Sequence, residues 1–302
     1  MSSQSAIITD RLTKRYGERV VVDTLSLEVA QGEVFGFLGP NGAGKTTTIA
    51  MLLGLVKPTA GRALVLGHDV ATAPTTAAAR VGAMIEAPAF YPYLNGYDNL
   101  RVLCRAGGLN EQRIAAALAV VELSERARDK VRVYSQGMKQ RLAIAATLLP
   151  DPALIILDEP TNGLDPAGTA EIRALIRALA ADGRTIFLCS HMLHEVEQVC
   201  ERVAILKAGR LIAQGRVAEL LHQRHGLRVR VEGDPAPAVA LVSTLSWVAG
   251  VRRDGDVLLI DAPADRAAEL NAHLARHGVL VAEIGAQGNS LEAFFLEVTG
   301  EP

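Results

Sequence analysis

The chain has 302 residues, 49% of them hydrophobic and 21% charged, a composition that can bury a core and excludes low-complexity disorder. This length predicts one large domain, or a medium domain followed by a small one. The formal charge of −2 gives no electrostatic reason to expect nucleic acid as a partner. The three cysteines, Cys104, Cys189 and Cys200, lack metal-ligand spacing, which predicts buried, reduced thiols.

The N-terminus shows no basic stretch followed by an apolar run, so we expect no signal peptide. The best candidate for a membrane span, residues 142–157, is broken by Pro150-Asp151-Pro152. Neither half reaches the roughly 20 apolar residues that a spanning helix needs. We therefore expect a soluble chain, for which any membrane role would come through a partner.

The first 90 residues predict short strands around one glycine-rich loop. Apolar runs and period-two alternation predict strands at 6–9, 20–22, 25–29, 34–38, 63–66 and 81–85. The glycine-rich loop, residues 39–47, reads GPNGAGKTT, and residues 47–53 follow it as a helix. The sequence therefore places this loop between a buried strand and a helix.

The loop has the spacing of a P-loop, with Gly39, Gly44, Lys45 and Thr46 in register. Such a loop offers backbone N–H groups to phosphates at a helix N-terminus. Lys45 would reach the β- and γ-phosphates, and the Thr46 hydroxyl would hold Mg²⁺. We expect the following residues to bind a nucleoside triphosphate: Gly39, Pro40, Asn41, Gly42, Ala43, Gly44, Lys45, Thr46 and Thr47.

The middle of the chain alternates helices and strands. The pattern is helical from about residue 94 to 149. Residues 153–157 form a bare apolar strand, typical of a parallel sheet buried on both faces, and Asp158 and Glu159 follow it. A helix at 167–181 and a strand at 184–189 continue the α/β order.

The pattern of expected strands and helices changes near residue 224, which predicts a second domain of about 75 residues. We expect strands at 227–232, 248–253, 257–261 and 279–284, and helices at 236–246, 265–276 and 290–298. The order of the first six elements suggests a small ferredoxin-like α+β module. It shows no catalytic constellation, so we assign residues 1–223 to a nucleotide-binding domain and 224–302 to an accessory domain.

A second phosphate motif lies at residues 134–141, YSQGMKQR, just before a helical run. By itself, Ser135 would be interpreted as an ordinary helix N-cap. The run then leads to the Asp158-Glu159 strand, to residues 160–165 (PTNGLD), and to His191 after one more strand. This ordered set resembles the ATP-binding subunit of ABC transporters over residues 5–215.

The resemblance implies a P-loop core with an antiparallel β subdomain and a helical subdomain at about 90–150. It also implies an ATPase in which two copies face each other head to tail and share two ATP molecules. Ser135 and Gly137 would bind the nucleotide on the partner's P-loop, although the best family form, LSGGQ, is altered here to YSQGM. The variant is similar to that of bacterial exporters whose membrane subunits are separate polypeptides.

The resemblance also assigns roles at the site. Asp158 would bind Mg²⁺, Glu159 would polarise the attacking water, and His191 would touch the γ-phosphate. Asp165 would contact the other copy, or it could simply cap the helix that begins at Pro166. Tyr16 would stack on adenine, or it could be a half-buried surface tyrosine.

Glu86 departs from the family, which normally has Gln at that position. A carboxylate there would be a stronger ligand for Mg²⁺ and could take part in catalysis, or it could be a solvated loop acid. This form resembles pumps that confer resistance to bacitracin and lantibiotics, so we expect export of a drug or peptide antibiotic.

The expected partners are an integral membrane subunit and a second ATP-binding subunit, in a homodimer on the cytoplasmic side of the cell membrane. One alternative is a soluble ABC-type ATPase acting on ribosomes or DNA, although a single P-loop without long heptads argues against it. The other is a P-loop kinase or GTPase, although Asn-Lys-x-Asp is absent and neither class needs YSQG.

Overall fold

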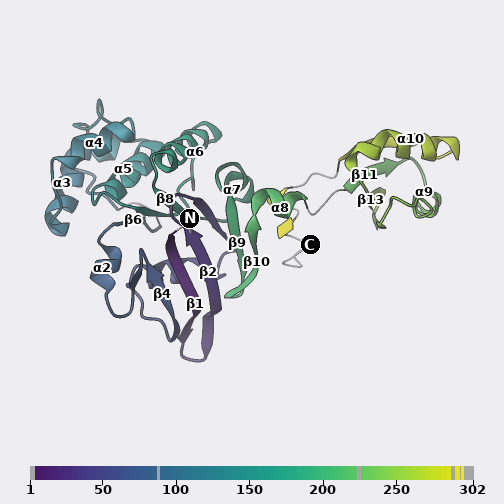
Figure 1. Ribbon diagram of the computed structural model, residues 1–302. Coiled ribbons are helices and arrows are strands. Elements are labelled where there is room, and N and C mark those ends of the chain that lie inside the picture. Colours follow the sequence, from purple (N-terminus) through teal and green to yellow (C-terminus); the bar gives the residue numbers. More distant parts are fainter. Residues whose placement is uncertain (1–3, 87–88, 223–225, 287–289, 293, 296–302) are drawn as a thin grey trace. The chain divides into compact units, whose positions relative to one another are not determined.

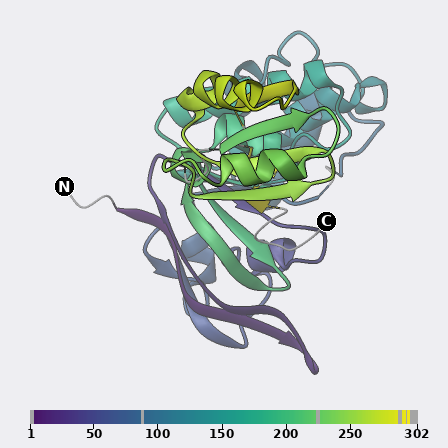
Figure 2. The same ribbon diagram turned by 90° about the vertical axis from the view of Figure 1, so that its right-hand side faces the viewer.

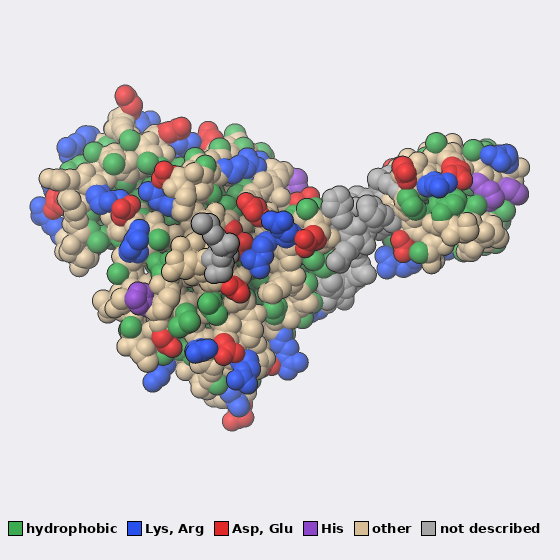
Figure 3. Space-filling view, viewed as in Figure 1, with side chains coloured by type: hydrophobic (Ala, Val, Ile, Leu, Met, Phe, Trp, Pro, Cys, Tyr) green, Lys and Arg blue, Asp and Glu red, His purple; other side chains and the backbone are tan. Residues whose placement is uncertain are grey.

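The computed structural model describes residues 4–86, 89–222, 226–286, 290–292 and 294–295. The chain divides into two compact units, residues 1–215 and 216–302 (Figures 1 and 2). The boundary expected from the sequence, after residue 223, lies inside the second unit. Among the described residues, no helix has the length and apolarity to cross a bilayer. On the face of the first unit seen in Figure 3, basic and acidic side chains are interspersed.

The first unit begins with a long hairpin of β1 (Ser5–Tyr16) and β2 (Arg19–Ala30), drawn in purple in Figure 2. The sequence predicted two separate strands where β2 runs unbroken. Thr24 enters the left-handed region (φ 51°), and its backbone N–H donates to Thr13 Oγ1 at 3.1 Å. The pairing shifts register nearby, so a bulge held by side chains absorbs the polar interruption. The hairpin joins β4 (Ala60–Val65) and β5 (His68–Asp69) in the sheet order β2-β1-β4-β5.

A second sheet forms the centre of the first unit. Its order is β10-β9-β3-β8-β7-β6, and its strands are β3 (Val34–Leu38), β6 (Val81–Met84), β7 (Leu154–Asp158), β8 (Thr185–Ser190), β9 (Arg202–Lys207) and β10 (Arg210–Arg216). From β9 to β6 all neighbours are parallel. Every residue of β3, β7 and β8 is buried, which confirms the prediction for the 153–157 strand. Because the strands are parallel, their carboxyl ends share one edge, where ligands bind in such sheets.

The main core lies between the two sheets. One hydrophobic cluster contains residues of both sheets together with Ile49, Met51 and Leu52 of α1 (Lys45–Leu52). Within it the rings of Phe37 and Phe187 lie 5.1 Å apart. This packing fixes α1, and with it the loop that precedes α1. The short α2 (Pro74–Ala78) follows β5.

The predicted helical region contains α3 (Gly96–Gly107), α4 (Arg113–Val120), a 3-10 turn η1 (Val131–Val133) and α5 (Gln136–Leu148), at upper left in Figure 1. Tyr134, which replaces the Leu of the family motif, is buried, and its hydroxyl donates to the Arg126 carbonyl oxygen at 2.6 Å. Gly96 makes room for that hydroxyl, because a Cβ there would clash with it. Two further helices, α6 (Pro166–Ala181) and α7 (Leu193–Val199), follow β7 and β8.

The second unit opens with α8 (Val217–His222) and contains an antiparallel sheet of order β12-β13-β11-β14. Its further elements are β11 (Gly226–Val231), α9 (Ala236–Val242), β12 (Gly250–Asp254), β13 (Val257–Asp261), η2 (Ala264–Arg266), α10 (Ala267–Arg276) and β14 (Val281–Ala286). Both α9 and α10 pack on one hydrophobic cluster with β11 and β13.

The helix predicted at 236–246 ends early, at Val242. The hydroxyls of Ser243 and Thr244 donate to the carbonyl oxygens of Val239 and Leu241, each at 2.7 Å, and so compete with further helical bonding. Of the helix predicted at 290–298, residues 291, 292, 294 and 295 are helical, while 293 and 296–298 lie outside the described residues.

Candidate functional site

The loop between β3 and α1 is shaped to hold phosphates. Gly44 caps α1 with φ 103°, in the left-handed region that suits glycine, and a Cβ on it would lie 2.7 Å from the Val21 carbonyl oxygen. Lys45 Nζ donates to the carbonyl oxygens of Gly39 at 2.6 Å and Pro40 at 3.3 Å. The ammonium group is therefore held within the loop, beside the N–H groups of the first helical turn, where anions bind.

The side-chain oxygens of Thr46 and Asp158 lie next to each other beside this loop. Thr46 Oγ1 lies 3.3 Å from Asp158 Oδ2, at the end of β7, and Asp158 is 4% exposed. Burial, followed by the charge of Glu159, raises the pKa of the Asp158 carboxyl above its usual value. A buried carboxylate with a raised pKa favours a nearby cation. No group of three His, Cys, Asp or Glu among the described residues forms a metal cage. This sparse oxygen set fits Mg²⁺, which usually keeps waters and phosphate oxygens as ligands.

Glu159 is held in place from two sides. Its φ is 53°, which is uncommon for a non-glycine residue, and its backbone N–H donates to the Cys189 carbonyl oxygen at 2.9 Å. Its Oε2 lies 2.8 Å from His191 Nδ1 and accepts from Ser190 Oγ at 3.4 Å. Since β8 ends at Ser190, the parallel pairing of β7 and β8 brings these groups together. Glu159 and His191, to which the sequence assigned separate roles, therefore contact each other.

Glu86 lies just beyond the end of β6 and is exposed, with φ 58°. Glu86 and Glu159 both have left-handed backbone, which is strained for a residue other than glycine. Such strain is commonly found at functional sites. Tyr16 ends β1 and is 52% exposed, with Lys14 Nζ 4.9 Å from the centre of its ring. Both Glu86 and Tyr16 line the cavity described next.

One cavity of about 490 Å³ unites most of the predicted residues. The described residues that line it are Tyr16, Arg19, Val21, Asn41, Gly42, Ala43, Gly44, Lys45, Thr46, Thr47, Glu86, Gln136, Gln140, Asp158, Glu159 and Asn162. Sequence reasoning did not single out Arg19, Val21, Gln136, Gln140 and Asn162. A signal existed for two of them, because Gln136 and Gln140 stand four apart on the helix after Ser135 and so share a face.

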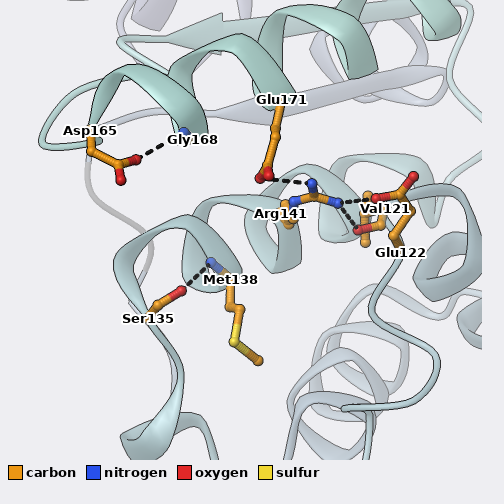
Figure 4. A network of polar contacts seen from close by, with 8 residues as sticks. All are labelled: Val121, Glu122, Ser135, Met138, Arg141, Asp165, Gly168 and Glu171. Atoms are coloured by element: carbon orange, nitrogen blue, oxygen red, sulfur yellow. Dashed lines mark hydrogen bonds and ion pairs between the residues drawn. The ribbon is translucent and has the colours of Figure 1, made fainter.

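Six of the predicted residues are not among the described residues that line this cavity: Gly39, Pro40, Ser135, Gly137, Asp165 and His191. Ser135 caps α5 and accepts from the Met138 N–H at 3.2 Å, while Asp165 caps α6 and accepts from the Gly168 N–H at 2.8 Å (Figure 4). Within one chain, Asp165 therefore acts as a helix cap, as the alternative interpretation of its sequence predicted. Ser135 is exposed, so the N-terminus of α5 is open to a partner.

The chain matches the family model described as ABC transporter over residues 22–162. It is 38% identical to the bacitracin transport ATP-binding protein BcrA of Enterococcus faecalis, covering 99% of this chain and 98% of that protein. It is 37% identical to the daunorubicin resistance ATP-binding protein DrrA3 of Streptomyces coeruleorubidus, covering 99% and 97%.

Among solved structures, the chain is similar to the dimeric post-hydrolysis state of the ATP-binding cassette MJ0796 bound to ADP and Pi. The identity is 25% and the TM-score 0.62, over 70% of this chain and 98% of that one. The chain matches these relatives over nearly their whole length, and it matches nearly the whole of the solved cassette in fold. This chain therefore belongs to the ATP-binding, ATP-hydrolysing subunits of ABC transporters.

Proposed function

We propose that this ATPase drives export of a drug or peptide antibiotic through a separate integral membrane subunit, to which it binds on the cytoplasmic side. The names of BcrA and DrrA3 support this class of cargo, because both relatives serve antibiotic transport or resistance. This chain would use ATP binding and hydrolysis to drive the transport. Binding and hydrolysis would do so by shifting the protein between two conformations.

Within the site, Thr46, Asp158 and Glu86 would hold Mg²⁺, which would supply positive charge to the β- and γ-phosphates. The P-loop N–H groups and Lys45 would bind the same phosphates, and Tyr16 would stack on the base. Glu159 would accept a proton from the attacking water while His191 orients its carboxylate. The 2.8 Å contact of His191 with Glu159, which lines the same cavity as Lys45 and Asp158, is the observation that carries this assignment.

We further propose that two copies form a homodimer in which Ser135 and Gly137 of one copy bind the ATP held by the other. An exposed serine at the N-terminus of α5, which is not among the described residues that line its own cavity, supports this arrangement. Asp165, at the start of α6, would face the partner. The accessory unit would be a ferredoxin-like module, as its strand order and its alternation of strands and helices suggest.

Glu159→Gln tests the hydrolysis site. The amide keeps the shape of the side chain but accepts a proton poorly, so we expect turnover to fall at least about a hundredfold while ATP still binds. With MgATP the variant should accumulate as a dimer, measured by light scattering during size-exclusion chromatography. Lys45→Ala is the matched control, which should lose nucleotide binding and remain monomeric. Wild-type turnover in Glu159→Gln would show that another group accepts the proton.

Export is tested separately, with any membrane protein that a neighbouring reading frame encodes. The two should copurify in detergent, and bacitracin or daunorubicin should stimulate ATP hydrolysis by the complex. ATPase activity that neither a membrane protein nor a drug alters would instead favour a soluble ATPase.

A further inference from the structure

Gly96 and Tyr134 fit closely against each other in the helical region. Gly96 is the buried first residue of α3, and its φ is not positive, so its backbone conformation does not require glycine. Glycine is also a poorer helix former than alanine. The reason for glycine is space, because a Cβ there would overlap the Tyr134 hydroxyl oxygen and lie 3.3 Å from the ring carbon that bears it.

The Tyr134 hydroxyl is itself fixed by a hydrogen bond. Tyr134 is 5% exposed, and the hydroxyl donates to the Arg126 carbonyl oxygen at 2.6 Å. Burial raises the pKa of this hydroxyl, so at neutral pH it keeps the proton that it donates. The ring is therefore held by a bond on one side and by the absence of a Cβ on the other.

Backbone hydrogen bonds join the same two segments, residues 92–97 and 127–132. Three N–H groups donate between them at 2.9 Å: Val131 to the Leu94 carbonyl oxygen, Arg132 to that of Pro92, and Tyr97 to that of Ala127. Asn95 and Lys130 form an antiparallel bridge in the same place. The chain that leads to Ser135 is thus anchored to the N-terminus of α3 through both its backbone and the Tyr134 side chain.

Ser135 follows Tyr134 directly and caps α5 (Figure 4). Consecutive Cα atoms lie about 3.8 Å apart, so a fixed Tyr134 fixes where the exposed serine begins. We propose that Tyr134, seated against Gly96, is a positioning residue that sets how Ser135 meets the nucleotide on the partner copy. The inference rests on the proposed dimer and adds to it the contact that holds the serine in place.

The position of this pair separates two steps of the ATPase cycle. Neither Tyr134 nor Gly96 is among the described residues that line the nucleotide cavity of their own copy. Displacing Tyr134 should therefore weaken the ATP-dependent dimer and leave nucleotide binding by a single copy unchanged. A pair with only a structural role would change the thermal midpoint and neither of these constants.

A double-mutant cycle of Gly96→Ala and Tyr134→Phe tests the proposal. Both are made in the full-length protein carrying Glu159→Gln, and the dimer dissociation constant with MgATP is measured by analytical ultracentrifugation. Gly96→Ala should raise this constant at least about tenfold, because the new methyl group displaces the tyrosine. Tyr134→Phe, which loses only the hydrogen bond, should raise it about threefold.

The double variant gives the decisive result. Without the hydroxyl oxygen, the methyl group of Gly96→Ala lies 3.3 Å from the ring carbon, a contact that small shifts relieve. The double variant should therefore recover to the roughly threefold effect of Tyr134→Phe, a coupling expected only of residues in contact. In every variant, Kd for a fluorescent ATP analogue, measured on monomer, should stay within about twofold of the Glu159→Gln protein.

Gly107→Ala is the matched control, the same substitution at the other end of α3. Its φ is also not positive, and a Cβ there would meet nothing nearer than the Leu109 side chain, at 3.3 Å. This variant should dimerise like the Glu159→Gln protein.

Three results would overturn the role of Tyr134: unchanged dimerisation in Gly96→Ala, a double variant as weak as Gly96→Ala alone, or an equal loss of nucleotide binding by the monomer. If Gly96→Ala does not fold, unchanged dimerisation in Tyr134→Phe, which adds no atom, has the same meaning. The dimer itself is judged separately. A Glu159→Gln protein that stays monomeric with MgATP removes the dimer and this role together, whereas a dimer that no variant weakens removes only the role of Tyr134.

Discussion

Asp158 shows how the site is tuned at the scale of one residue. It is buried at the end of β7, next to Glu159 and 3.3 Å from the Thr46 hydroxyl. Burial, followed by the neighbouring charge, raises its pKa, so the ionised form destabilises the protein in the absence of a cation. A bound Mg²⁺ would reverse this effect by favouring the ionised form.

The raised pKa predicts a pH dependence of stability. The folded chain binds this proton more tightly than the unfolded chain, so this group makes the free energy of unfolding fall as pH rises. The fall begins near the unfolded value of about 4 and is complete above the raised pKa. Asp158→Asn removes the titration, so without nucleotide we expect its thermal midpoint at pH 7–8 to exceed that of wild type by a few degrees.

Thermal unfolding from pH 4 to pH 8 measures this difference. The two midpoints should converge toward the acidic end, because protonation of Asp158 removes the difference in charge between the two proteins. With MgATP the order should reverse, because only the wild type retains the carboxylate. A variant that is less stable than wild type across the whole range, without nucleotide, would contradict the stated balance of burial and charge.

The residues that could be predicted are those whose geometry is set locally. Gly44 and Lys45 occupy fixed places in a short loop between a strand and a helix, and Asp158 and Glu159 end a buried strand. The spacing of Gln136 and Gln140 puts them on one face of α5, but only the packing of α5 brings that face to the cavity, and only the shape of the hairpin brings Arg19 there. The left-handed backbone of Glu86 likewise depends on how β6 ends.

At the scale of elements, the buried central strands were predictable because their apolar runs are uninterrupted. The unbroken length of β2 was not, because Asp23 and Thr24 interrupt it as a turn would, and only the bulge held by Thr13 shows that the strand continues. The end of α9 has a similar cause, since its last turns are decided by the hydroxyls of Ser243 and Thr244.

One guanidinium group joins three helical elements in the first unit. Arg141 on α5 donates to the Val121 carbonyl oxygen at 3.0 Å, to Glu122 at 2.8 Å and to Glu171 on α6 at 2.9 Å (Figure 4). Its side chain is only 16% exposed, so these bonds are partly shielded from water. The helix capped by Ser135 is thereby tied to the helix capped by Asp165.

Arg141→Lys should break this connection, because an ammonium group cannot present the planar fork that reaches all three acceptors. Losing at least one charged hydrogen bond predicts a decrease of about 1–3 kcal/mol in the free energy of unfolding of the first unit, measured by urea denaturation. Arg105→Lys is the matched control, since its pair with Glu111 is exposed and little change is expected. Equal stability of the two variants would show that Arg141 contributes no more than a surface ion pair.

At the scale of the whole molecule, each unit contains a hydrophobic cluster built from its own described residues. The described cluster between the two sheets of the first unit extends to Leu211, and that of the second begins at Leu227. The nucleotide cavity is lined by residues 16–162, all in the first unit. Separate cores predict separate cooperative transitions, and one cavity predicts that only one transition responds to nucleotide.

Calorimetry of the full chain should therefore show two unfolding transitions, of which MgATP raises only the one belonging to residues 1–215. A ligand at about 100 times its Kd should stabilise that unit by about 2.7 kcal/mol. Leu258→Ala, at a fully buried position of β13, should lower the other transition by about 2–5 kcal/mol and leave ATP hydrolysis unchanged. A single transition that nucleotide and Leu258→Ala shift together would mean that the two units unfold as one.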